Sequence, residues 1–246
     1  MSATLERPRY TVLGGPNGAG KSTTFARLTE WGYRSGAFLN PDEITKGLDG
    51  PEPTRAVAAG RETLRRSRAW MANRKSFVRE STLSSREIVR SVQAARDAGY
   101  RVTLIFVGLN TVCATKNRVR IRTRSGGHPI PLRDQERRFL RSFDNAPRVA
   151  AIADEAYFLD NGSGQPRTVA VVHHGIVLFR DTASAAWVER ATAGLAPKRP
   201  MWDRETVLEW MRREEDMSDE LREGAGSYEA KAVDSEAIGA RPAARP

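Results

Sequence analysis

The chain carries at residues 15–22 the stretch Gly15-Pro16-Asn17-Gly18-Ala19-Gly20-Lys21-Ser22, which matches the pattern G-x-x-x-x-G-K-[ST] at every position. An apolar run precedes this stretch, and a helical pattern that begins at Lys21 and includes Thr23 follows it. A strand, a glycine-rich loop and a helix in this order form a P-loop, in which backbone N–H groups and the helix N-terminus surround a phosphate group. The motif predicts a nucleoside triphosphate site.

Each part of this motif has an expected role. We expect the backbone of residues 15–23 to bind ATP, the Lys21 ammonium to reach the β- and γ-phosphates, and the Ser22 hydroxyl to hold Mg²⁺. ATP and Mg²⁺ are therefore the expected cofactors. With three histidines and one cysteine, the chain offers little for a zinc site.

Strands and helices alternate along the rest of the chain, which predicts an α/β fold, a three-layer P-loop NTPase sandwich with a mainly parallel sheet. The expected strands lie near residues 10–15, 36–40, 76–80, 102–107, 157–160, 168–173 and 176–179, the last two forming a hairpin. We expect residues 1–216 to form one domain with a helical lid at about residues 114–145 and a C-terminal helix at 202–216. Residues 217–246 lack apolar periodicity, which predicts a disordered tail.

Two local patterns predict helix boundaries. The stretch Ser84-Ser85-Arg86-Glu87 fits the cap of a helix that ends at Gly99. Separate helices are expected at residues 133–143 and at residues 148–157, where the second leads into the strand at 157–160.

The charge of the chain is concentrated in one window. Of 246 residues, 40 are Lys or Arg, and the net charge is +10. Residues 116–148 contain ten cations and three acids, so this window carries most of the excess. Such a patch fits phosphate groups of ATP, of a phosphorylated substrate or of nucleic acid.

Composition also bears on location. The longest apolar run, at residues 102–107, is too short to cross a bilayer, so no membrane association is expected. The single cysteine, Cys113, fits the reducing cytoplasm. We expect a cytoplasmic protein.

Two acidic residues follow predicted strands. Asp42 comes after the second strand and Glu80 ends the third, and in an open α/β sheet the ligand crevice lies beyond the carboxyl ends of the strands. Asp42 could therefore accept the proton of an attacking hydroxyl group, or it could merely cap the helix that begins there. Glu80, followed by Ser81 and Thr82, could position substrate or hold Mg²⁺-bound water, or it could be a solvated acid at a strand end.

Arginines of the basic window share helix faces. Arg118 and Arg122 are four residues apart, and the Gly126-Gly127 break suggests a mobile hairpin. Arginines that close over a phosphate chain neutralise charge in the transition state and exclude water. Residues of the second helix could join them, namely Arg137, Arg138 and Arg141. The alternative is a solvated charged surface.

Together these motifs resemble the zeta-toxin kinases. The resemblance covers about residues 9–180 and rests on the P-loop, on Asn40-Pro41-Asp42-Glu43-Ile44 and on Glu80-Ser81-Thr82-Leu83. Later stretches, at Arg118–Arg122, Gly126–His128 and Arg137–Asn145, are similar to a small branch of the family.

The resemblance implies a P-loop kinase domain at residues 1–216. Better-known members of the family use ATP to phosphorylate a sugar hydroxyl of UDP-N-acetylglucosamine and are restrained by an antitoxin protein. Carried over by position, Lys21 and Ser22 hold phosphate and Mg²⁺, Asp42 is the base, and Glu80 and Thr82 line the substrate side. Arg122 and one arginine of the pair Arg137 and Arg138 clamp phosphate. Arg118 belongs to the same substrate-side cluster.

The sequence leaves two alternatives open. One is a polynucleotide kinase or another metabolite kinase, in which the basic window binds the acceptor and affinity falls steeply with salt. The other is a regulatory switch that hydrolyses ATP without an acceptor and has no need of Asp42 as a base. Because nothing in the sequence names the acceptor, the leading expectation is a small polar metabolite such as a nucleotide sugar.

Overall fold

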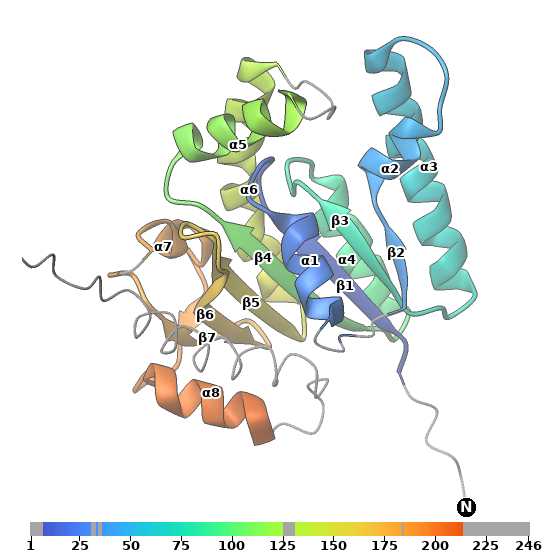
Figure 1. The fold of residues 1–246 in the computed structure, drawn as a ribbon. Coiled ribbons are helices and arrows are strands. Elements are labelled where there is room, and N and C mark those ends of the chain that lie inside the picture. Colours follow the sequence, from blue (N-terminus) through green and yellow to red (C-terminus); the bar gives the residue numbers. More distant parts are fainter. Residues whose placement is uncertain (1–6, 31–32, 34–35, 125–130, 184, 214–246) are drawn as a thin grey trace, which may run out of the picture.

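The computed structural model describes residues 7–30, 33, 36–124, 131–183 and 185–213, with the backbone alone at residues 52, 122–124 and 211–213 (Figure 1). The predicted tail at residues 217–246 and the Gly126-Gly127 break therefore lie outside the described residues. In the described part, no helix is both long enough and apolar enough to cross a membrane.

An eight-stranded sheet forms the centre of the described part, in the order β2-β3-β1-β4-β5-β6-β7-β8. Five strands run parallel: β2 (Ala37–Leu39), β3 (Phe77–Ser81), β1 (Arg9–Gly14), β4 (Arg101–Gly108) and β5 (Glu155–Asp160). The strands β6 (Arg167–His173) and β7 (Ile176–Arg180) form the predicted antiparallel hairpin, and β8 (Ala196–Pro197) pairs in parallel with β7. The predicted α/β class with a mainly parallel sheet is confirmed.

Helices cover both faces of the sheet (Figure 1). On one face lie α1 (Lys21–Glu30) and α8 (Arg204–Arg213), and on the other lie α3 (Glu52–Ala72), α4 (Glu87–Asp97), α6 (Leu132–Ile152) and α7 (Trp187–Ala191). Neighbouring strand residues therefore enter different cores. Val12 packs in one core with Ile88 of α4 and Val149 of α6, whereas Leu13 packs in another with Leu28 of α1. This arrangement is the expected three-layer sandwich.

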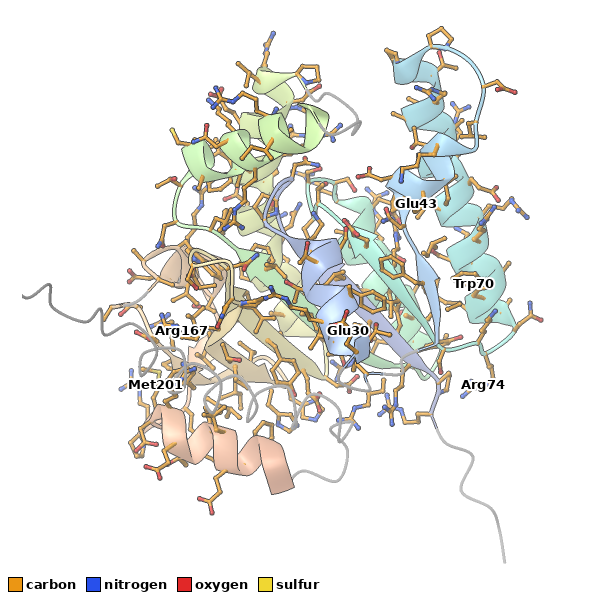
Figure 2. The ribbon with its side chains drawn as sticks, viewed as in Figure 1. Glu30, Glu43, Trp70, Arg74, Arg167 and Met201 are labelled. Carbon is orange, nitrogen blue, oxygen red and sulfur yellow. The ribbon has the colours of Figure 1, made fainter. Side chains whose placement is uncertain are left out.

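The segments that follow the parallel strands gather at one edge of the sheet. The P-loop follows β1, the short helix α2 (Pro41–Lys46) follows β2, and α5 (Val112–Arg124) follows β4. Figure 1 shows α5 and the start of α6 rising above this carboxyl edge on one side, with α2 and the start of α3 on the other. In Figure 2, Glu43 marks this edge, whereas Trp70 and Arg74 mark the opposite end of the molecule, toward which α3 runs.

The two helices expected at residues 133–143 and 148–157 are instead one helix, so this prediction was wrong. The helix α6 spans 21 residues with Pro147 inside it and ends at Ile152, before β5 begins. Proline removes one backbone hydrogen bond from a helix. The apolar face that includes Phe143, Ala146 and Val149 nevertheless stays buried on the sheet through this point, and its packing keeps the helix continuous.

The predicted cap of α4 was also wrong. The helix begins at Glu87, and the preceding Arg86 makes no side-chain capping hydrogen bond. Both ends of the expected cap have other partners, because Ser84 Oγ lies 2.8 Å from Thr82 Oγ1 and Glu87 accepts hydrogen bonds from Arg79.

An aromatic cluster holds α6 on the sheet. Phe143 is buried, and its ring centroid lies 5.4 Å from that of Phe106, 4.8 Å from that of Phe139 and 5.6 Å from that of Trp187. We expect Phe143→Ala to lower the free energy of unfolding by about 3–5 kcal/mol, because it leaves a cavity in this cluster. Leu140→Ala, on the exposed side of the same helix, should cost less than about 1 kcal/mol. Urea denaturation of both variants checks this, and equal losses would contradict the assignment.

Candidate active site

The P-loop lies so close to its neighbours that side chains are excluded at its three glycines, of which Gly18 and Gly20 face the segments after β4 and β5. Gly18 has a φ of 74°, and a Cβ added there would lie 2.6 Å from the carbonyl oxygen of Thr115 in α5. Gly20 has a φ of 94°, and its Cβ would lie 2.2 Å from Asn161 Nδ2. Only glycine combines these positive φ angles with such contacts. The loop that would bind phosphate is therefore enclosed by α5 on one side and by the segment after β5 on the other.

Asn161 and Arg118 hold the P-loop in this position. Asn161 is buried at the end of β5, and its Nδ2 donates to the carbonyl oxygen of Ala19 at 2.8 Å. Arg118 Nη2 in turn donates to the carbonyl oxygen of Asn161 at 2.7 Å. Asn161 was not predicted from the sequence, although a polar residue directly after a buried strand was a usable signal. Arg118, predicted on the substrate side, lies beside the P-loop and does not line the cavity described below.

Glu80 connects the two functional side chains of the P-loop. Its Oε2 accepts a hydrogen bond from Ser22 Oγ at 2.9 Å, and its Oε1 lies 3.7 Å from Lys21 Nζ. Lys21 Nζ also donates to the carbonyl oxygen of Pro16 at 3.1 Å. Lys21 and Glu80 are both buried, so this charge pair is screened little by solvent. The structure therefore places Glu80 with the residues expected to hold phosphate and Mg²⁺.

Asp42 lies in the first turn of α2 and is exposed. The helix is capped by Asn40, whose Oδ1 accepts a hydrogen bond from Asp42 N at 2.8 Å. The capping role considered for the Asp42 carboxylate thus belongs to Asn40. The Asp42 side chain lines the same cavity as Lys21 and Glu80.

A cavity of about 810 Å³ connects these residues across the carboxyl edge of the sheet. The residues that line it include Lys21 and Gly18 at the P-loop, Asp42, Thr82, and Arg138 on α6. Its lining includes seven cations and three acids: Lys21, Arg79, Arg86, Arg137, Arg138, Arg141 and Arg148, against Asp42, Glu80 and Asp144. The cavity therefore favours anionic ligands.

The arginines of α6 differ in their partners. Arg137 donates to Asp134 Oδ1 at 2.8 Å, and this hydrogen bond lowers the pKa of Asp134. Among the described residues, no carboxylate lies within ion-pair distance of Arg138, Arg141 or Arg148. These guanidinium groups therefore stay available to a ligand. The predicted role of Arg122 concerns a side chain outside the described residues.

A link between α5 and α6 joins the two helices of the expected lid. Lys116 Nζ donates to Glu136 Oε1 at 2.6 Å, and this hydrogen bond raises the pKa of Lys116. On the inner side of α5, buried Val119 lies next to Gly18. The helix is thus joined to the P-loop and to the arginine-bearing helix.

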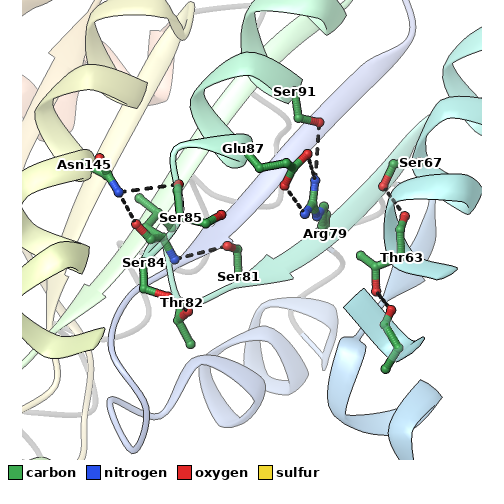
Figure 3. Close-up of polar contacts among 12 residues, drawn as sticks. Thr63, Ser67, Arg79, Ser81, Thr82, Ser84, Ser85, Glu87, Ser91 and Asn145 are labelled. Carbon is green, nitrogen blue, oxygen red and sulfur yellow. Dashed lines mark hydrogen bonds and ion pairs between the residues drawn. The ribbon is translucent and has the colours of Figure 1, made fainter. Parts of the chain in front are cut away.

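Arg79 is a buried cation of the cavity wall that the sequence analysis missed. Its Nη2 and Nη1 donate to the two carboxylate oxygens of Glu87 at 2.7 and 3.3 Å, and Nη1 also donates to Ser91 Oγ at 3.3 Å (Figure 3). A charged residue one position before Glu80, directly after the apolar pair Phe77 and Val78 of the predicted strand, was the available signal. Arg79 fixes the start of α4 against β3.

Comparisons with known proteins identify the family of this chain. The sequence model of the family described as "Zeta toxin" matches residues 2–161. An uncharacterized protein of Haemophilus influenzae is 30% identical over 118 residues, which cover 47% of this chain and 81% of the relative.

Two groups of solved structures are similar in fold. The crystal structure of AvrRxo1-ORF1 and AvrRxo1-ORF2 with ATP has a TM-score of 0.59 at 16% identity and covers 90% of this chain and 76% of that chain. The PezAT chromosomal toxin-antitoxin system of Streptococcus pneumoniae has a TM-score of 0.50 at 17% identity and covers 65% of this chain and 70% of that chain. At these identities the likeness is one of fold.

Because the P-loop is enclosed, we expect one added methyl group at Gly18 to weaken the binding of ATP. In Gly18→Ala the added Cβ meets a backbone oxygen of α5, so the loop must shift, and we expect ATP affinity to fall by at least about tenfold. Gly194→Ala is the matched control, because Gly194 also has a positive φ, of 78°, but nothing within 4 Å of its Cβ position. Calorimetric titration with Mg·ATP checks this, and equal affinities for the two variants would show that the enclosure is unimportant.

Proposed function

This chain belongs to the zeta toxin family, and we propose that it is an ATP-dependent kinase that transfers the γ-phosphate to a hydroxyl group of a small polar acceptor. The observation that carries the proposal is the arrangement around the cavity. Lys21 and Glu80 line the cavity, Ser22 is hydrogen-bonded to Glu80, and Asp42 lines the same space. A phosphate donor and a hydroxyl acceptor could therefore meet between them.

The P-loop side supplies the groups that an ATP·Mg²⁺ complex needs. Lys21 neutralises charge on the transferring phosphate, and backbone N–H groups of residues 15–23 orient the phosphate chain. The Ser22 hydroxyl and the Glu80 carboxylate, 2.9 Å apart, form an oxygen donor set of the kind that Mg²⁺ prefers. When bound, Mg²⁺ supplies further neutralisation of phosphate charge.

Asp42 is the proposed general base. Its carboxylate accepts the proton of the acceptor hydroxyl as the oxygen of that hydroxyl bonds to the γ-phosphorus of ATP. The bond between the γ-phosphorus and the bridging oxygen breaks, and ADP leaves. The exposed position of Asp42, on the wall opposite the arginines of α6, leaves the carboxylate accessible to an incoming hydroxyl group.

The arginines of α6 are proposed to act on phosphate. Arg138 would meet the charge of the transferring phosphate together with Arg137, and Arg122, whose side chain lies outside the described residues, keeps its expected clamp role. The helices at about residues 114–145 would act as a lid. Because α6 is anchored on the sheet through Phe143, and α5 is linked to α6 through Lys116 and Glu136, this lid would be a fixed cover over the phosphates.

Arginines of the cavity that are not assigned to ATP support an acceptor with negative charge of its own. Arg86, Arg141 and Arg148 line the cavity, and the Asp144 that lines it with them is paired with Arg190. A nucleotide sugar carries such charge on its diphosphate, so UDP-N-acetylglucosamine is the first acceptor to test. The related fold of a toxin-antitoxin system likewise supports an antitoxin partner as a proposal.

The acceptor is identified by incubation of the protein with labelled ATP and either UDP-N-acetylglucosamine or a metabolite extract. Transfer of label to a small molecule supports the kinase proposal. Transfer to an oligonucleotide, with strong dependence on salt, would instead favour the polynucleotide kinase alternative, which the cationic cavity also accommodates.

Asp42→Asn tests the base. We expect ATP affinity to stay near the wild-type value and phosphate transfer to fall by about 10²-fold or more, because the carboxamide cannot accept the proton. Lys21→Ala is the contrasting variant and should abolish transfer through the donor side. Calorimetry and steady-state kinetics separate the two effects. Unchanged turnover in Asp42→Asn would favour an ATP-hydrolysing switch that needs no base.

Arg138→Ala tests the arginine clamp. We expect a fall in turnover of about 10²-fold with little change in the KM for ATP, because the guanidinium acts mainly on charge that develops in the transition state. Arg138→Lys should restore little. Arg120→Ala is the control, since Arg120 is exposed and does not line the cavity. Equal, small losses at both positions would indicate a diffuse electrostatic surface.

A further inference from the structure

The segment of residues 81–85, at the end of β3 and in the loop after it, has a backbone conformation that its sequence does not favour. Leu83 has a φ of 53° although it is not glycine, and its side chain is completely buried. A branched residue in the left-handed region is strained and persists only where the surroundings hold it. This loop carries Thr82 into the cavity and directly follows Glu80.

Three contacts hold Leu83 in this conformation. Ser81 Oγ accepts a hydrogen bond from Leu83 N at 3.1 Å, and Asn145 Nδ2 of α6 donates to the carbonyl oxygen of Leu83 at 2.6 Å. The Leu83 side chain packs against Gly14, where an added Cβ would lie 2.3 Å from Leu83 Cδ1. The loop therefore packs against the end of β1, the strand that precedes the P-loop. Figure 3 shows Asn145 pointing from α6 at the carbonyl groups of this loop.

A second residue of α6 holds the neighbouring peptide. The hydroxyl of Ser142, which is fully buried, lies 2.8 Å from the carbonyl oxygen of Thr82 and 2.7 Å from the carbonyl oxygen of Arg138. Ser142 and Asn145 follow Arg138 by four and seven residues, so all three lie on one face of the helix. The helix face that carries Arg138 at the cavity is therefore the same face that forms hydrogen bonds with the loop of Thr82.

We propose that Ser142 and Asn145 are positioning residues that keep Thr82 and Arg138 in one fixed relation to the P-loop. The proposal rests on the proposed kinase function, in which Thr82 faces the acceptor and Arg138 faces the transferring phosphate. Neither Ser142 nor Asn145 has a hydrogen bond to Lys21, Ser22 or Asp42 among the described residues. Their loss should therefore disturb the alignment of the acceptor and leave the binding of ATP largely intact.

The variants Ser142→Ala and Asn145→Asp test this. Ser142→Ala removes one hydroxyl from a buried site. Asn145→Asp replaces the Nδ2 donor with an oxygen that faces the carbonyl groups of Leu83 and Ser85. Leu140→Ala, on the exposed side of α6, is the matched control. Thermal melting of all three variants establishes which fraction is folded.

In kinetic assays with Mg·ATP and UDP-N-acetylglucosamine, we expect the turnover number to fall by about tenfold in Ser142→Ala and by about 10²-fold in Asn145→Asp. The KM for ATP should change less than about threefold, because the P-loop contacts are untouched. Turnover that falls only in proportion to the folded fraction, or an equal rise in both KM values, would overturn the proposal.

Hydrogen–deuterium exchange provides a readout that needs no acceptor. We expect the amides of residues 81–85 to exchange at least about tenfold faster in Ser142→Ala than in the wild type or in Leu140→Ala, with the P-loop amides unchanged. Unaltered exchange at residues 81–85 would overturn the positioning role. Absence of any transfer by the wild type to UDP-N-acetylglucosamine, with faster exchange in the variants, would instead reject the proposed acceptor and retain the positioning role.

Discussion

The contact of Glu80 with Lys21 and Ser22 is the interaction on which the rest of the site depends. It joins the end of β3 to the start of α1 across 58 residues of sequence, and its charged members are buried. A buried carboxylate is tolerated only when a cation and hydrogen-bond donors surround it, which Lys21 and Ser22 supply. This pairing brings the loop after β3 beside the P-loop, so that Thr82 follows at the edge of the same cavity.

A second constraint comes from close packing around the P-loop. Glycines allow α5 and the segment after β5 to approach the loop to distances that a side chain would prevent, and Asn161 and Arg118 stabilise that approach. Rigid packing of this kind orients the backbone N–H groups before a ligand arrives. The conformational entropy of the loop is then lost during folding, so that binding of a ligand no longer has to order the loop.

The helix α6 contacts both the hydrophobic core and the cavity. Phe143 and Val149 anchor it on the sheet, whereas Arg138 and Arg141, on another side of the same helix, line the cavity. The concentration of arginines near a small number of acids opposes folding through repulsion, and the buried aromatic cluster offsets that cost. One face of this helix therefore serves stability, and another carries the arginines to which we assign phosphate recognition.

Local sequence determined a large part of this protein. The P-loop, the alternation of strands and helices, the hairpin at His174 and Gly175 and the positions of Asp42 and Glu80 at strand ends all follow from short stretches, because each depends on neighbouring residues. Tertiary structure alone decided which of these parts meet. Hydrogen bonds join Glu80 with Ser22, Arg118 with Asn161, and Asn145 with Leu83. The residues of each pair are 43 to 62 positions apart in the sequence. Pro147 stayed inside one helix because burial of its neighbours outweighed the lost hydrogen bond. Such outcomes depend on packing between distant segments, which no local pattern encodes.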